Sequence, residues 1–210
     1  MSPEDGESWY ELHVELESLI VVQPNEGFDE YRDNDLRRYT GPISIVSGEP
    51  EQAVEIGEIE LWYMDGSRAC ETDLDIVDVC DSLGQEEYEY AASIFSNGVL
   101  DSSIVEEPIS DDVLVLHSIA IRPEYRGKGY GLRVTRKIVE TLGYRCGAVL
   151  LKPAPLQFSA READKEWMSR MGMSAFSTDR ETAIRKLTDY WNVLDLRLTK
   201  DPSIYCIAYF

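Results

Sequence analysis

A glycine-rich loop is the part of the chain best suited to holding a charged ligand. It reads Arg126-Gly127-Lys128-Gly129-Tyr130-Gly131 and separates an apolar run from an amphipathic one. Glycine lets the backbone turn tightly and brings amide N–H groups close to a ligand. The start of a helix adds unpaired N–H groups and the positive end of the helix dipole. We interpret the loop as a phosphate-binding site rather than a simple tight turn.

The spacing of this loop argues against two common phosphate ligands. A nucleoside triphosphate loop requires Gly-Lys-Ser/Thr, whereas Lys128 is followed by Gly129. A dinucleotide-binding loop requires a third glycine where this chain has Leu132, and an acidic residue after the next strand. That next strand ends at Lys152-Pro153 instead. Neither ligand class fits.

The elements around the loop form a crossover unit. The apolar residues 113–116 and 119–121 predict a strand buried on both faces, which Pro123 would end. A helix from about residue 131 to 142 and a second apolar strand at 148–151 follow. Strand, loop, helix and strand in this order predict two parallel or nearly parallel strands.

The rest of the chain is expected to complete a single α/β domain over residues 1–210. Alternating apolar and polar residues predict a strand at 10–16, with further strands near 43–45 and 59–63, the latter ended by a turn at Asp65-Gly66. Residues 25–38 read as a loop or a short irregular helix, and residues 74–95 as helical, though one unbroken helix is not assured. Residues 154–182 read as an insertion, and residues 181–194 as a helix before a terminal hairpin of 196–198 with 204–210.

The net charge of −20 limits the partners of the protein. An acidic surface repels phosphate backbones, so nucleic acid is not an expected partner. Two interpretations stay open: a solvated surface adapted to high salt, or one that attracts a cationic acceptor such as a polyamine, an aminoglycoside or a basic peptide. The sequence has no apolar run long enough to span a bilayer and no secretory signal, so we expect a cytoplasmic protein without a membrane partner.

The cysteines and histidines do not suggest a metal site. Four cysteines without a C-x-x-C pair and only two histidines favour reduced thiols, mostly buried. No metal ligand is therefore expected.

Residues 119–132 resemble the signature of the Gcn5-related N-acetyltransferase (GNAT) superfamily. Its motif, Arg/Gln-x-x-Gly-x-Gly/Ala, is met by Arg126, Gly129 and Gly131, and the preceding Pro-Glu-Tyr matches as well. The resemblance covers residues 113–151 and resumes at 186–210, with a divergent half before 112 on the acceptor side. It implies a central mixed, twisted β-sheet flanked by helices, with acetyl-CoA or another acyl-CoA as cosubstrate and a small-molecule or peptide amine as acceptor.

The resemblance also implies which residues hold the cofactor. Residues 113–153 would form the acyl-CoA binding core, whose two strands splay apart to admit the thioester. Main-chain groups around Ile119 and Ile121 would pair with the pantetheine arm, and the loop amides would hold the pyrophosphate. The full expected set is Ile119, Ala120, Ile121, Arg126, Gly127, Lys128, Gly129, Tyr130, Gly131, Leu132 and Trp191.

Acyl transfer to an amine needs a base more than an acid. A lysine-like amine with a pKa of about 10.4 costs roughly 4 kcal/mol to deprotonate at neutral pH, whereas a thiolate leaves with a pKa of about 8.5. His117 is the candidate base, and a hydrogen-bonded structural histidine is the alternative. Glu60 and Glu124 could relay protons.

The general acid is where the chain departs from the family pattern. Family members carry Phe-Tyr-x-x-x-Gly-Phe on the last helix, whereas this chain has Trp191 at the tyrosine position and Tyr190 one residue earlier. Indole N–H cannot supply a proton near neutral pH. Tyr190 is therefore the candidate acid, unless no side-chain acid is used or both aromatics only pack the core.

We expect an acyltransferase acting by direct attack. The alternative is a non-catalytic acyl-CoA-binding or protein-interaction module. A third interpretation, a nucleic-acid mimic, has only the net charge in its favour.

Overall fold

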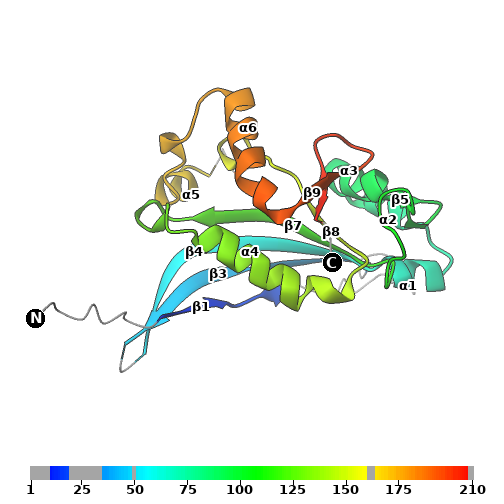
Figure 1. Ribbon diagram of the computed structural model, residues 1–210, viewed down its shortest axis with the longest axis horizontal. Helices are drawn as coiled ribbons and strands as arrows, with labels where there is room; N and C mark the ends of the chain where they lie inside the picture. Colours follow the sequence, from blue (N-terminus) through cyan, green and yellow to red (C-terminus); the bar gives the residue numbers. More distant parts are fainter. Residues whose placement is uncertain (1–9, 19–34, 49–50, 160–163, 208–210) are drawn as a thin grey trace, which may run out of the picture.

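The computed structural model describes residues 10–18, 35–48, 51–159 and 164–207. Its centre is an eight-stranded mixed sheet in the order β1-β3-β4-β7-β8-β10-β9, with β2 pairing with β3 (Figure 1). All pairs are antiparallel except β7 with β8. The strands are β1 (Tyr10–Val14), β2 (Glu17–Ser18), β3 (Leu36–Ser47), β4 (Gln52–Met64), β7 (Val113–Ile121), β8 (Ala148–Leu151), β9 (Leu196–Leu198) and β10 (Tyr205–Ile207). The predicted α/β class with a mixed sheet and a C-terminal hairpin is confirmed.

Helices cover both faces of this sheet. The helices α1, α2 and α3 group at one end, α5 and α6 lie toward the opposite end, and α4 runs along the sheet (Figure 1). The first group is α1 (Gly66–Glu71), α2 (Ile76–Leu83) and α3 (Gln85–Ile94), followed by a small hairpin of β5 (Phe95–Ser96) and β6 (Val99–Leu100). The others are α4 (Tyr130–Thr141), α5 (Lys165–Arg170) and α6 (Arg180–Trp191). Short 3₁₀ turns lie at Pro123–Tyr125, Gly143–Arg145, Leu156–Phe158, Met173–Ala175 and Asn192–Leu194.

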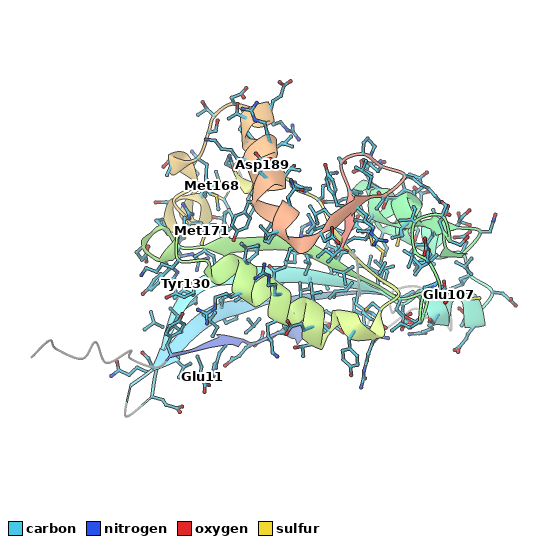
Figure 2. All side chains as sticks on the ribbon, viewed as in Figure 1. Glu11, Glu107, Tyr130, Met168, Met171 and Asp189 are labelled. Carbon is cyan, nitrogen blue, oxygen red and sulfur yellow. The ribbon has the colours of Figure 1, made fainter. Side chains whose placement is uncertain are left out.

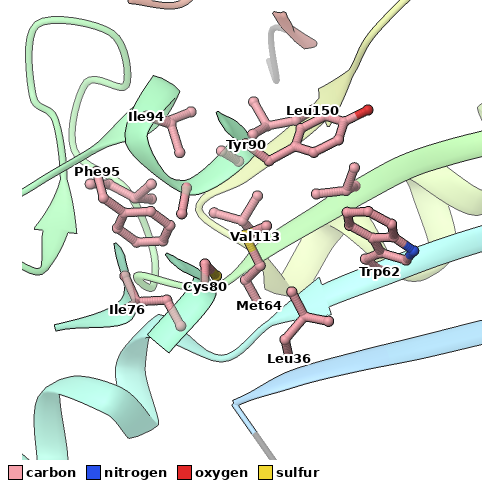
Figure 3. Close-up of a cluster of buried hydrophobic side chains, with 14 of the residues drawn as sticks. Leu36, Trp62, Met64, Ile76, Cys80, Tyr90, Ile94, Phe95, Val113 and Leu150 are labelled. Carbon is pink, nitrogen blue, oxygen red and sulfur yellow. The ribbon is translucent and has the colours of Figure 1, made fainter. Parts of the chain in front are cut away.

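Two apolar clusters lie on opposite faces of the sheet. In the first, Trp62, Met64 and Val113 pack against α1–α3 (Figure 3). In the second, Leu61 and Leu114 pack against Tyr130, Val134 and Ile138 of α4 and against Trp191 of α6. Because neighbouring strand residues point to opposite faces, β4 and β7 contribute side chains to both clusters. The second cluster positions the start of α4 beside β7.

Several expectations for the first half of the chain need correction. Residues 36–38 belong to β3 rather than to a loop. The helical stretch of residues 74–95 is two helices, α2 and α3, and a further helix, α1, precedes it. Asp65 does not form a turn: it caps α1 by accepting a hydrogen bond from the Arg68 N–H at 3.1 Å. Asp75 caps α2 in the same way, and Gly84 separates α2 from α3. The apolar residues 19–22 and the last residues, 208–210, lie outside the described part of the chain.

The stretch between β8 and α6 packs onto the end of β7. Trp167, Met171 and Met173 form a small buried cluster with Ala120. The indole N–H of Trp167 donates to Glu58 Oε2 of β4 at 2.9 Å, and Arg170 pairs with the same carboxylate. The stretch expected to be an insertion therefore packs against β4 and β7.

The four cysteines are free thiols, as expected, with Cys70 exposed and the other three buried. In the described ranges, none of the helices combines the length and apolar character that a membrane crossing demands.

Candidate active site

The cleft begins where β7 and β8 stop pairing. Their parallel register runs from Val113 opposite Ala148 to Leu116 opposite Leu151. β8 ends at Leu151, and the chain leaves the sheet through Lys152 and Pro153. Beyond Leu116, the edge of β7 that faced β8 lines a cleft. An unpaired strand edge of this kind offers main-chain donors and acceptors to an extended ligand.

A β-bulge sits at the same level of β7. Its partner β4 pairs Glu60 with Ser118 but Leu61 with Leu116, so His117 is an extra residue in the ladder. A bulge bends its strand and redirects side chains. The side chain of His117 therefore lies with the Trp62 cluster, on the face opposite Ile119 and Ile121.

The cleft has a volume of about 620 Å³ and brings together most of the predicted residues. Of the expected cofactor set, Ile119, Ala120, Ile121, Arg126, Gly127, Gly129, Tyr130, Gly131 and Trp191 line it. Both candidate catalytic residues, His117 and Tyr190, line it as well. Lys128 and Leu132 are not among its lining residues; the Lys128 ammonium lies 5.5 Å from the centre of the Tyr125 ring.

The glycine loop and the first two residues of α4, Tyr130 and Gly131, line this cleft. Gly127 and Gly129 have φ of 76° and 75°, the left-handed region that glycine adopts without strain. Gly129 is the N-cap of α4 and offers no side chain to cap its amides. No acidic residue lies in the first turn of α4. The loop is thus built to present backbone donors and the helix dipole to an anion.

Arg126 directs its guanidinium away from the start of α4 and toward backbone carbonyl groups. Its Nε donates to the Ile121 carbonyl at 2.8 Å, and its Nη atoms donate to the carbonyls of Met171 and Gly172. The guanidinium carbon also lies 4.4 Å from the centre of the Phe176 ring. In Figure 2 Tyr130 marks the beginning of α4 and Met171 lies on the segment beside it. Arg126 is therefore a clamp that fixes the wall of residues 171–176 to the end of β7.

His117 lies between two carboxylates. Its Nδ1 is 3.4 Å from Glu60 Oε1 and its Nε2 is 3.4 Å from Glu86 Oε1 of α3. The ring stacks on Trp62 at 4.1 Å between centroids, and the Trp62 indole N–H donates to Glu60 at 2.9 Å. Burial lowers the pKa of His117, but the two carboxylates outweigh it and raise the pKa to about 9. His117 is an imidazolium at neutral pH.

The last helix places its two aromatics differently. Trp191 is buried against the second cluster, with its ring 4.7 Å from that of Tyr190. The hydroxyl of Tyr190 accepts a hydrogen bond from the backbone N–H of Leu132, in the first turn of α4. Burial raises the pKa of Tyr190, and this hydrogen bond partly offsets the rise.

The comparison with known families agrees with this arrangement. The model of the acetyltransferase (GNAT) family matches residues 56–161, about half of the chain. The chain belongs to the acetyltransferase (GNAT) family. No curated protein and no solved structure matches it significantly. The matched residues run from β4 through β7, the glycine loop and α4 to β8, so the GNAT assignment covers the split strands and the glycine loop together.

Sequence reasoning missed two parts of this candidate site. Glu86 reaches His117 from a helix whose packing on the sheet no local pattern predicts. Phe176 and the wall around it looked like an insertion because residues 156–182 lack a clean period. A usable signal did exist on β4, where Glu58, Glu60 and Trp62 alternate and therefore share one face.

Proposed function

We propose that this protein transfers an acetyl or similar acyl group from acyl-CoA to an amine by direct attack. The observation that carries the proposal is the convergence of three features on one cleft. These are the uncapped start of α4, the exposed edge of β7 beyond Leu116, and the bulge at His117. GNAT membership supports acyl-CoA as the ligand of such a cleft.

The cofactor would lie along the edge of β7. Loop amides at 127–131 would bind the pyrophosphate, and main-chain groups near Ile119 and Ile121 would pair with the pantetheine amides. From Ile121 to Leu116 the strand advances five residue steps, or roughly 16 Å at about 3.3 Å per step. The thioester would then lie near the split, beside the bulge. Mostly apolar lining such as Leu116 and Leu151 would exclude water there.

The acceptor amine would approach from the α1–α3 face. His117, Glu60 and Glu86 converge there, and the Glu86 side chain is 49% exposed. Carboxylates attract an ammonium group, and the overall charge of −20 strengthens the attraction at low ionic strength. We therefore propose a positively charged amine as acceptor.

In the proposed reaction the neutral amine nitrogen attacks the thioester carbonyl carbon, and the C–S bond breaks to release the CoA thiolate. The amine must first lose a proton, and His117 is the group placed to accept it. Its resting imidazolium must itself lose a proton; a bound ammonium nearby favours this loss, because like charges lower the pKa of a cationic group. Glu60 would hold the ring in place throughout.

The test measures the release of free thiol from acetyl-CoA in the presence of each amine of a panel. The pH profile is recorded with an acceptor amine whose own pKa lies well below 9. We expect the rate of the wild-type protein to rise with pH toward about 9. His117→Gln should lose that rise while still binding acetyl-CoA. A mutant profile identical to the wild type would remove His117 from the reaction.

A non-catalytic acyl-CoA-binding module remains the second candidate, and one observation favours it. Trp191, at the position of the family's tyrosine acid, is buried in the second cluster. Binding of acetyl-CoA without thiol release, across the whole amine panel, would select this candidate.

A further inference from the structure

The hydroxyl of Tyr190 lies at the phosphate end of the cleft. It accepts the N–H of Leu132, and a methyl group placed on Gly131 would lie 2.8 Å from its oxygen. The same position on Gly131 lies 3.9 Å from Cγ1 of Ile121. The hydroxyl is therefore beside the last residue of β7, whereas the strand split begins at Leu116.

This placement separates Tyr190 from the proposed thioester position. Ile121 and Leu116 are five residue steps apart along β7, a separation of roughly 16 Å. A proton donor to the departing thiolate must come within hydrogen-bonding distance of the sulfur. The hydroxyl of Tyr190 is instead close to the amides expected to bind pyrophosphate.

The hydrogen bond with Leu132 determines what the hydroxyl can still do. Its oxygen accepts the amide proton, so its own O–H remains as a donor. Burial raises the pKa of Tyr190, so the group stays neutral and keeps that proton. The side chain is 39% exposed and lines the cleft, where a ligand can reach it. A hydroxyl that donates to a phosphate oxygen forms a charge-assisted hydrogen bond.

We propose that Tyr190 is a phosphate-binding residue: it extends the amide site of α4 by donating its hydroxyl proton to the pyrophosphate of acyl-CoA. This inference rests on the proposed function, because it assumes that acyl-CoA occupies the cleft. It gives Tyr190 a role in cofactor affinity in place of proton transfer to sulfur. Trp191, the next residue, keeps α6 packed against the sheet. No side chain of α6 then donates a proton to the departing thiolate.

The first test compares the wild type with Tyr190→Phe. The dissociation constant for CoA, measured by calorimetry, should rise about tenfold or more, as expected for a lost hydrogen bond to a charged group. The turnover number at saturating acetyl-CoA should not change. S-acetyl-pantetheine, which lacks the pyrophosphate, should react equally well with both proteins. An unchanged dissociation constant, or a lower turnover number at saturation, would overturn the inference.

A second variant tests the position of the Tyr190 hydroxyl by changing Gly131, the residue beside it. Gly131→Ala should fold normally, because its methyl group meets only the movable end of the Tyr190 side chain. It should displace the hydroxyl and weaken CoA binding to a similar extent. The double variant should bind CoA no more weakly than the single variant with the lower affinity, since both substitutions remove the same interaction. Additive losses would contradict the inference.

These experiments also separate the inference from the proposed function. Failure of the wild-type protein to bind CoA at millimolar concentration would overturn both. Wild-type binding that Tyr190→Phe leaves unchanged would overturn the role of Tyr190 alone.

Discussion

Nδ1 of His117 lies 3.4 Å from Oε1 of Glu60, across the bulge that joins β7 to β4. On its other side, Nε2 lies 3.4 Å from Glu86 of α3. The imidazole thus links two strands and one helix at the level where the cleft opens. The same contacts that stabilise the fold here also set the protonation state of the proposed base.

The first prediction concerns stability and pH. The pKa of His117 is raised from 6.5 to about 9 in the folded state, so the folded protein holds the proton more tightly than the unfolded chain. The resulting stabilisation, on the order of 3 kcal/mol, is fully present below pH 6.5 and is lost as the pH rises through about 9. Urea unfolding between pH 6 and 10 should show this loss in the wild type and not in His117→Gln. Parallel curves for the two proteins would contradict it.

The second prediction isolates the role of Glu86. Removing its charge in Glu86→Gln should lower the pKa of His117 from about 9, because one of the two carboxylates that raise it is gone. NMR titration of the imidazole protons measures this directly. Glu89→Gln is the matched control, since Glu89 lies on the same helix but pairs with Lys152 at 2.8 Å. Equal shifts in both variants would show that overall charge, not the contact, controls the pKa.

The third prediction concerns the clamp formed by Arg126. Arg126→Ala removes the donors to three carbonyl groups and should reduce the free energy of unfolding by roughly 2–4 kcal/mol. Limited proteolysis should then cut within residues 171–177. Lys128→Ala, at an exposed site in the same loop, should change stability by less than about 0.5 kcal/mol. Resistance of the Arg126 variant to protease would show that the wall holds without the clamp.

The sequence predicted the elements that carry strong local patterns. β7, the glycine loop and α4 were located within a residue or two, because a buried strand, a glycine cluster and a helical period each leave a local signature. Residues 36–38 were misread because Arg37 and Arg38 continue the charged and polar run that precedes them in the sequence, which resembles a loop. The break between α2 and α3 at Gly84 was suggested by Asp81 and Gly84 on the otherwise apolar face.

The site was predictable in its main chain and less so in its side chains. The open amides of α4 follow from the glycines at 127, 129 and 131. The direction of the Arg126 side chain does not, because it depends on carbonyl groups 45 residues away at Met171. The contact of Glu86 with His117 likewise depends on how α3 packs, which tertiary contacts decide.

The central claim, that the glycine loop binds the phosphates of acyl-CoA, is tested most directly by calorimetry of acetyl-CoA with the wild type, Gly129→Asn and Gly129→Asp. Gly129 has φ of 75° and open space at its Cβ position, so both variants should fold, since asparagine and aspartate tolerate the left-handed region better than other side chains. The two side chains have nearly the same shape, but only aspartate places a negative charge beside the pyrophosphate. We predict saturable binding by the wild type, weaker binding by Gly129→Asn and none by Gly129→Asp. Equal affinity in all three proteins would contradict the account.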